Sequence, residues 1–322
     1  MRIAPISNYR YSNNNTVPRK RDYSYSSKPK TDCTFTARPI NYNYLYRKSL
    51  ALHNAYILRT NPLQVEQYFA RMGIPAKFDE GTEYGRKFVA YGVFNAFEIF
   101  RQLHFKPPVS IKLIDFRKFN DPTILDATGI ATPAQLAVPQ DKIYPPRSVF
   151  FNSFAMNKPY FINGQWKPYC WENFFEIMEY ARANNLISTE HFLSPFVHEF
   201  AHTLHYDKIY SKFGSPFPHP EYAYNPKTND LLAKLNLNLS GNNPYVSHFI
   251  TKNITDNISQ YGTTNLFETF AEGFTKDILN NINLFTLRLE RYPFDGTNNN
   301  QTIREILYET FEGLVGDGTG QI

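Results

Sequence analysis

The chain contains little cysteine, no long apolar run and no glycine-rich phosphate-binding motif. It has only two cysteines in 322 residues, which excludes a disulfide framework. No stretch of about 18 apolar residues occurs, so we expect no transmembrane helix. Neither a Walker-type sequence nor G-x-G-x-x-G is present, so nothing in the sequence supports nucleotide binding.

The first 45 residues carry the chain's positive charge. They contain eight Lys or Arg and two Asp, a net charge of +6, while the whole chain has +5. They are rich in Asn, Ser and Tyr without apolar periodicity, which predicts a disordered basic tail. We interpret the cluster Arg19-Lys20-Arg21 as solvated, with a targeting signal or a patch for anionic surfaces or nucleic acid as alternatives. No apolar stretch typical of a standard secretory signal is visible here.

Residues 46–322 are expected to form one folded domain of the α+β class, mainly helical, with a small sheet. Hydrophobic residues make up 42% of the chain, which permits a substantial core. Apolar spacing predicts helices over 44–72, 85–103 and 171–186 and strands over 109–113 and 148–151, while 118–145 is irregular. Further on, we expect a loop over 214–228, short helices over 231–237 and 246–254, and a last helix beginning near Thr302.

The most informative motif is His198-Glu199-Phe200-Ala201-His202, which reads H-E-x-x-H. On a helix, residues four apart share a face, so both imidazoles can bind one zinc ion, with Glu199 beside a zinc-bound water. The alternative is a polar stretch of a surface helix, but the surrounding residues are largely apolar. Ser194-Pro195 is typical of a helix start, and a start at Ser188 with a kink at Pro195 is the alternative.

A catalytic zinc needs a third protein ligand. The extended three-histidine pattern fails, because His205 stands where that pattern requires Gly and Lys208 where it requires His. Downstream, Glu268 and Glu272 lie four residues apart on a predicted apolar helix that runs to about 278, and such carboxylates need a cation or strong donors. The alternatives are a capping box between Asn265 and Glu268, and an exposed carboxylate for Glu272.

These residues carry a family resemblance. Tyr261-Gly262, Asn265 and Glu268-Thr269-Phe270-Ala271-Glu272, placed after H-E-x-x-H, resemble the catalytic domain of anthrax toxin lethal factor, whose family includes the clostridial Pro-Pro endopeptidases. The resemblance is strongest from 186 to 278. It implies a zincin-like domain with the sheet beside the active-site helix, and His198, His202 and Glu268 as ligands of one Zn²⁺.

The resemblance also implies roles for the remaining site residues. Glu199 would be the general base, Tyr261 the hydroxyl near the zinc, and Glu272 a carboxylate behind the ligands that hydrogen-bonds one of them or holds the helix. His205 is expected to be a wall or supporting group of the site rather than a ligand. Because peptidases of this class add substrate to a sheet edge as an extra strand, Ser148–Asn152 is the predicted edge.

The sequence therefore predicts a zinc endopeptidase acting on a protein or peptide substrate. One alternative is a catalytically inactive relative that binds a peptide or partner, although every expected ligand and the general base are present. A thermolysin-like enzyme would also use a Glu ligand, but the tyrosine seven residues before Glu268 favours the lethal-factor pattern. Nucleic-acid binding through the basic tail would leave both motifs unexplained. The resemblance implies secretion, with a cytoplasmic location as the alternative.

Overall fold

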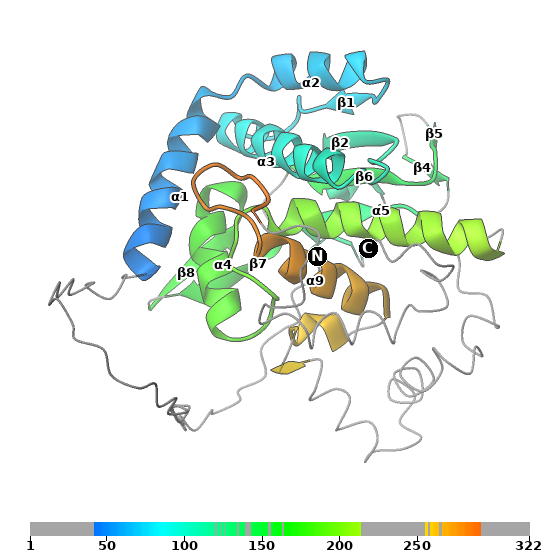
Figure 1. Cartoon of the computed structure of the whole chain (residues 1–322). Helices are drawn as coiled ribbons and strands as arrows, with labels where there is room; N and C mark the ends of the chain where they lie inside the picture. Colours follow the sequence, from blue (N-terminus) through cyan, green and yellow to red (C-terminus); the bar gives the residue numbers. More distant parts are fainter. Residues whose placement is uncertain are drawn as a thin grey trace, which may run out of the picture.

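The computed structural model describes residues 42–213 and 255–290, apart from gaps at 120, 123, 126, 134, 139–142, 154–155, 163, 257 and 264–265. In this part of the chain, helices surround a small mixed sheet, which confirms the mainly helical α+β class (Figure 1). No helix found there is both long and apolar enough to cross a bilayer. The loop over 214–228, the helices over 231–237 and 246–254, and the last helix from Thr302 lie outside the described residues, as does the tail up to residue 41.

The amino-terminal part contributes three helices: α1 (Tyr42–Arg59), α2 (Pro62–Arg71) and α3 (Glu83–Gln102). The stretch predicted as helical over 44–72 consists of α1 and α2, and the Asn61 side chain caps α2 by accepting a hydrogen bond of 3.0 Å from the backbone N–H of Leu63. Thr82 caps α3 in the same way. Helix α1 already begins at Tyr42, within the segment assigned to the tail.

The main sheet has four strands: β1 (Ala76–Lys77), β2 (Ser110–Ile114), β6 (Ser148–Asn152) and β3 (Gly129–Ala131), in that spatial order. Strand β2 pairs in parallel with β1 and β6, and β3 pairs antiparallel to β6. The strands predicted over 109–113 and 148–151 are thereby confirmed. All five residues of β6 are buried.

The prediction that Ser148–Asn152 forms the sheet edge is wrong. Strand β6 is an interior strand, with β2 on one side and β3 on the other. The two outer positions belong to β1 and β3, and β3 lies in the segment expected to be irregular. The reason is physical: β6 is an apolar run buried on both faces, whereas the short β3 contains Gly129 and has few side chains to bury.

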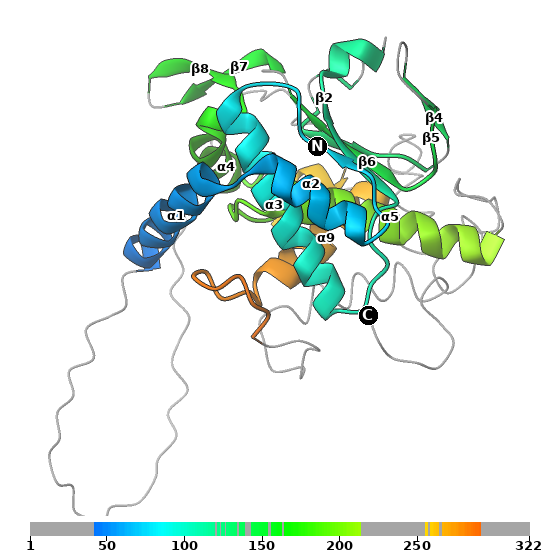
Figure 2. The same cartoon turned by 90° about the horizontal axis from the view of Figure 1, so that it is seen from above.

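Shorter elements complete the fold: the 3-10 helices η1 (Phe116–Phe119) and η2 (Trp171–Asn173), and the hairpins β4 (Leu136–Ala137) with β5 (Ile143–Tyr144) and β7 (Met156–Ile162) with β8 (Gln165–Tyr169). The two hairpins form separate sheets. Seen from above, they lie on opposite sides of the molecule, with β7 and β8 beside α4 (Figure 2).

Three further helices follow along the chain: α4 (Phe174–Ala183), α5 (Ser194–Phe213) and α9 (Leu266–Leu279). The 3-10 helix η3 (Tyr261–Thr263) directly precedes α9. Helix α5 lies between α3 and the sheet on one side and α9 on the other (Figure 1). One face of α5 therefore enters the hydrophobic core, and the opposite face meets α9.

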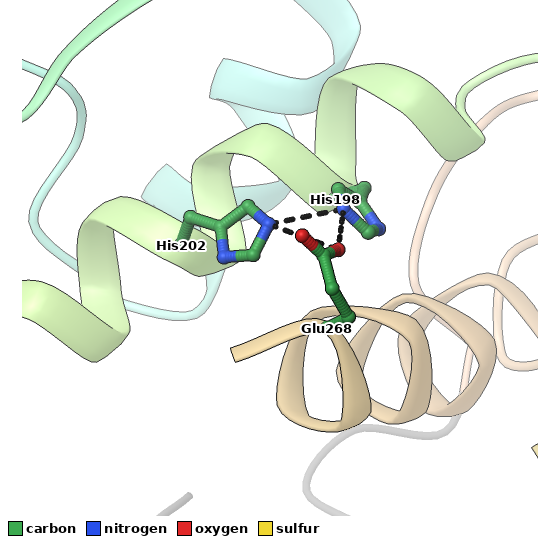
Figure 3. Close-up of side chains that lie close together, drawn as sticks. All are labelled: His198, His202 and Glu268. Atoms are coloured by element: carbon green, nitrogen blue, oxygen red, sulfur yellow. Dashed lines mark hydrogen bonds and ion pairs between the residues drawn. The ribbon is translucent and has the colours of Figure 1, made fainter. Parts of the chain in front are cut away.

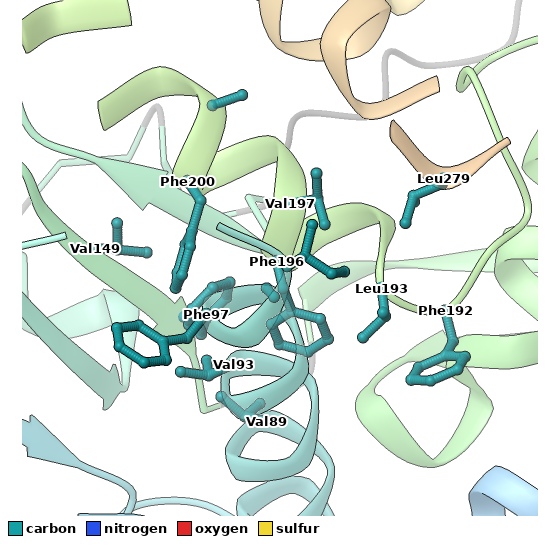
Figure 4. Close-up of a cluster of buried hydrophobic side chains, with 14 of the residues drawn as sticks. Val89, Val93, Phe97, Val149, Phe192, Leu193, Phe196, Val197, Phe200 and Leu279 are labelled. Carbon is teal, nitrogen blue, oxygen red and sulfur yellow. The ribbon is translucent and has the colours of Figure 1, made fainter. Parts of the chain in front are cut away.

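The core face of α5 carries Phe196, Val197 and Phe200, all fully buried. Their side chains pack among those of α3 and the sheet (Figure 4). The closest approach is between Phe196 and Gly92 of α3, where a Cβ atom on residue 92 would lie only 2.1 Å from Cε2 of the ring. A glycine at position 92 thus lets α5 pack closely against α3.

Gly92→Ala is expected to destabilise the protein by about 1–3 kcal/mol, because the added methyl group overlaps the Phe196 ring in a core with no room to relax. The free energy of unfolding in urea measures the effect. Gln102→Ala, at the exposed end of the same helix, is the control and should change that free energy by no more than about 0.5 kcal/mol. Equal stability of the two variants would contradict the close packing.

Candidate metal centre

The H-E-x-x-H motif lies in the first half of α5. The helix begins at Ser194 with Pro195 in its first turn, which confirms the later of the two predicted starts. The backbone N–H groups of Phe196 and Val197 both bond to the carbonyl of Leu193. Because residues four apart share a helix face, His198 and His202 point together toward α9 (Figure 3).

Glu268 of α9 reaches the space between the two imidazoles (Figure 3). Its Oε2 atom lies 3.0 Å from Nε2 of His198 and 3.4 Å from Nε2 of His202, and the two Nε2 atoms are 3.0 Å apart. The three side chains offer ligand atoms that all lie within 4.8 Å of one another. Among the described residues, this is the only such group of three.

The chemistry of this donor set fits a metal cation. Nδ1 of His198 lies 3.0 Å from a carboxylate oxygen of Glu272, which only accepts, so Nδ1 carries a proton and Nε2 is the ring nitrogen that points into the group and would give up its own proton to bind a metal. Although burial opposes a charge on His198, its hydrogen bonds to Glu268 and Glu272 raise its pKa to about 10, so positive charge is favoured here. A divalent cation would supply this positive charge beside the same two carboxylates and would be coordinated by the Nε2 atoms of both histidines.

The Glu268 carboxylate is ionised at neutral pH. Burial alone would raise its pKa, but the charge of His202 and the hydrogen bonds from both histidines lower it well below its usual value. Its side chain is 16% exposed, whereas that of His198 is 1% exposed. Of the three side chains in the group, that of Glu268 keeps the largest exposed fraction. The structure places Glu268 beside both imidazoles, where it could bind a metal ion. The alternative capping role stays a prediction, because its partner Asn265 lies outside the described residues.

Glu272 is completely buried behind His198. One oxygen faces Nδ1 of His198, and the other accepts hydrogen bonds from the backbone N–H of Ser188 at 2.7 Å and the hydroxyl of Ser259 at 2.8 Å. These contacts fix the carboxylate and, through it, the ring of His198. The alternative of an exposed carboxylate is therefore wrong. Sequence reasoning missed both serines, because neither belongs to a motif and each comes from a different loop.

Glu272→Gln is expected to weaken metal binding by about 10- to 100-fold, the usual effect of losing a carboxylate that orients a ligand histidine. An amide can offer its oxygen to His198 only by turning its NH₂ group toward the N–H of Ser188. Competition with a chromogenic zinc chelator measures the affinity. Glu179→Gln, at an exposed position of α4, is the matched control, and equal affinity in the two variants would exclude the orienting role.

Glu199, the expected general base, is 2% exposed and lies against strand β3. Gly129 of β3 lies directly against it: a Cβ atom on residue 129 would come within 2.8 Å of Cγ and 3.1 Å of Oε1 of Glu199. Strand β3, one of the two outer strands of the sheet, therefore borders the carboxylate. Sequence analysis gave no indication of Gly129, which is an ordinary glycine in an irregular segment until the fold places it.

Tyr261 lies next to the group at the start of η3. Its backbone N–H bonds to the carbonyl of Leu186 at 3.1 Å, and its ring centroid is 6.0 Å from that of His198. Gly262 is tied to α9, since its carbonyl accepts a hydrogen bond of 2.6 Å from the Thr269 hydroxyl. The Tyr-Gly pair and the helix that carries Glu268 are thus joined directly.

His205 and Tyr206 occupy the turn of α5 that follows His202. His205 is 1% exposed, packs against the rings of Phe267 and Phe270 and is not part of the ligand group, as expected for a wall residue. Burial and the nearby His202 hold its pKa well below the usual value, so it is neutral. Tyr206, which sequence analysis did not single out, stacks on His202 with ring centroids 6.0 Å apart.

No protein-family model matches this chain, and no curated protein and no solved structure is significantly similar to it. The geometry of the group itself is therefore the basis for assigning a function.

Proposed function

We propose that this protein is a zinc-dependent endopeptidase with a zincin-like catalytic domain related to that of lethal factor. The observation that carries the proposal is the convergence of His198, His202 and Glu268 from two helices on one buried point, with Glu199 adjacent in the motif. Two imidazoles and a carboxylate are the ligand set of many hydrolytic zinc sites, and zinc supplies Lewis-acid polarisation of a peptide carbonyl when bound.

In the proposed reaction, the residues of the chain position the substrate and move the proton. Glu199 accepts a proton from the attacking water and delivers it to the departing amide nitrogen. Its position against Gly129 places this proton transfer between α5 and β3. The scissile peptide therefore lies between the ligand group and β3, and we propose β3 rather than β6 as the strand that guides the substrate.

Glu272 and Tyr261 support this arrangement. Glu272 holds His198 in the tautomer that presents Nε2 to the metal. The ring of Tyr261 adjoins His198, and we propose that its hydroxyl donates a hydrogen bond to the oxygen that becomes negatively charged as the carbonyl is attacked.

Tyr261→Phe is expected to lower kcat by about 10²-fold, the usual effect of losing one oxyanion donor, while zinc content and stability stay as in the wild type. The phenylalanine retains the ring that packs beside His198 and lacks only the hydroxyl. Steady-state kinetics on a cleaved peptide measure the change. An unaltered kcat would remove Tyr261 from the reaction and leave it a packing residue.

The experiment that tests the proposed function is cleavage of a proteome-derived peptide library, read by mass spectrometry with and without a zinc chelator. Cuts that require the metal and are absent in Glu199→Gln establish the peptidase. A protein that binds one zinc ion and a peptide but cleaves nothing would instead support the catalytically inactive, peptide-binding alternative. Absence of bound metal, or iron in place of zinc, would refute the proposal.

A further inference from the structure

Two aromatic side chains adjoin the ligand group beside His202 and Glu268. Tyr206 lies one turn after His202 on α5, and its ring is nearly parallel to the imidazole, with an interplanar angle of 14°. Phe267 precedes Glu268 on α9, and its ring centroid is 5.6 Å from that of Tyr206. Tyr206 is thus one helical turn from the ligand residue His202, and Phe267 is the direct neighbour of Glu268. The two rings contact each other.

These rings differ from the rest of the site in exposure. The ligand histidines, Glu199 and His205 are all buried, whereas Tyr206 and Phe267 are each only partly buried. One face of Tyr206 is covered by His202, and Phe267 is held from behind by His205. Both rings therefore have fixed positions and retain accessible surface, which are the properties of a binding wall rather than of core packing.

The two rings offer an apolar surface beside the group. Because an aromatic side chain prefers an edge-to-face or offset-stacked neighbour, a substrate ring can pack against Tyr206 or Phe267.

We propose that Tyr206 and Phe267 form an aromatic wall that selects substrates with an aromatic residue next to the scissile bond. The inference rests on the proposed peptidase function and specifies its substrate class. The Tyr206 ring centroid is 6.0 Å from that of the His202 imidazole, so the wall lies directly beside the proposed place of cleavage.

The first test is library cleavage by the wild type, Tyr206→Ala, Tyr206→Phe and Phe267→Ala. Wild type and Tyr206→Phe should prefer Phe, Tyr or Trp beside the cut, and both alanine variants should lose that preference by about 2- to 13-fold, the factor that corresponds to the about 0.5–1.5 kcal/mol contributed by one aromatic pair. Tyr210→Ala is the matched control, because Tyr210 lies one turn further along α5 and is 59% exposed. Zinc content of each variant, measured by elemental analysis, shows whether the ligand group is retained.

The second test measures binding without turnover. Zinc-loaded Glu199→Gln is titrated with two fluorescent hexapeptides that differ only in Phe or Asp at one central position, alone and combined with Tyr206→Ala. Tighter binding of the Phe peptide that disappears with Tyr206→Ala supports the wall even if the alanine variant is inactive. If the wild type cleaves peptides and all variants keep the same residue preference, the proposed aromatic wall is refuted and the peptidase function is not. Failure of the wild type to cleave any peptide would refute the peptidase function as well.

Discussion

Glu199→Gln is expected to lower kcat for peptide cleavage by about 10³- to 10⁴-fold while bound zinc stays unchanged. The amide has nearly the same shape as the carboxylate but cannot accept the proton of the attacking water. Glu199 is buried and contacts Gly129, so the substitution alters neither the ligand group nor an exposed surface. Because the change affects one proton acceptor, the loss should be confined to kcat.

The measurement is steady-state cleavage of the best library peptide, together with elemental analysis of the purified variant. Glu179→Gln at the surface of α4 provides the control for a lost carboxylate and should behave as the wild type. Wild-type turnover by Glu199→Gln would show that another group accepts the proton. Loss of zinc would instead show that Glu199 helps to hold the metal.

Glu268→Ala is expected to abolish zinc binding at micromolar concentrations and, with it, all cleavage. The substitution removes the one carboxylate within 3.4 Å of both imidazole Nε2 atoms, and two histidines alone are fewer ligands than a catalytic zinc site uses. The affinity should fall by more than the about 10- to 100-fold expected for Glu272→Gln, which alters a partner of a ligand rather than a ligand.

The same chelator competition compares the two variants directly. The order of the zinc affinities matters more than either value. Glu268→Ala should bind zinc more weakly than Glu272→Gln, and both variants should bind it more weakly than the wild type. Retention of wild-type zinc affinity by Glu268→Ala would exclude Glu268 as a ligand and leave only the two histidines. Circular dichroism of the metal-free protein shows whether the fold survives without the carboxylate.

The helices that build the site were predictable because their information is local. Apolar residues at three- and four-residue spacing marked α3, and Ser194-Pro195 marked the start of α5. The four-residue spacing of the two histidines is enough to place both on one face of a helix. Glu268 was predictable as their companion because carboxylates on an apolar helix need a cation, and α9 does bring it to the group.

The sheet was less predictable, because the position of a strand depends on which partners reach it. Strand β6 has the sequence of a buried strand, yet nothing within it shows whether neighbours lie on both sides. The structure pairs it with β2 and β3 and so makes it interior. Strand β3 is three residues long, too short for a pattern of alternation to be recognised.

The sequence by itself determined the chemistry of the candidate site: two histidines and a glutamate on one helix, with carboxylates on a second. Only the tertiary structure decided how these groups are supported and bordered. Glu272 became an orienting carboxylate because two loops bring Ser188 and Ser259 to it, and Gly129 became a neighbour of Glu199 because β3 pairs beyond β6. Tyr206 became part of the proposed aromatic wall because α9 places Phe267 against it. Such contacts join residues far apart in the chain, so no local pattern records them, whereas ligand spacing along one helix is fixed by the geometry of the helix itself.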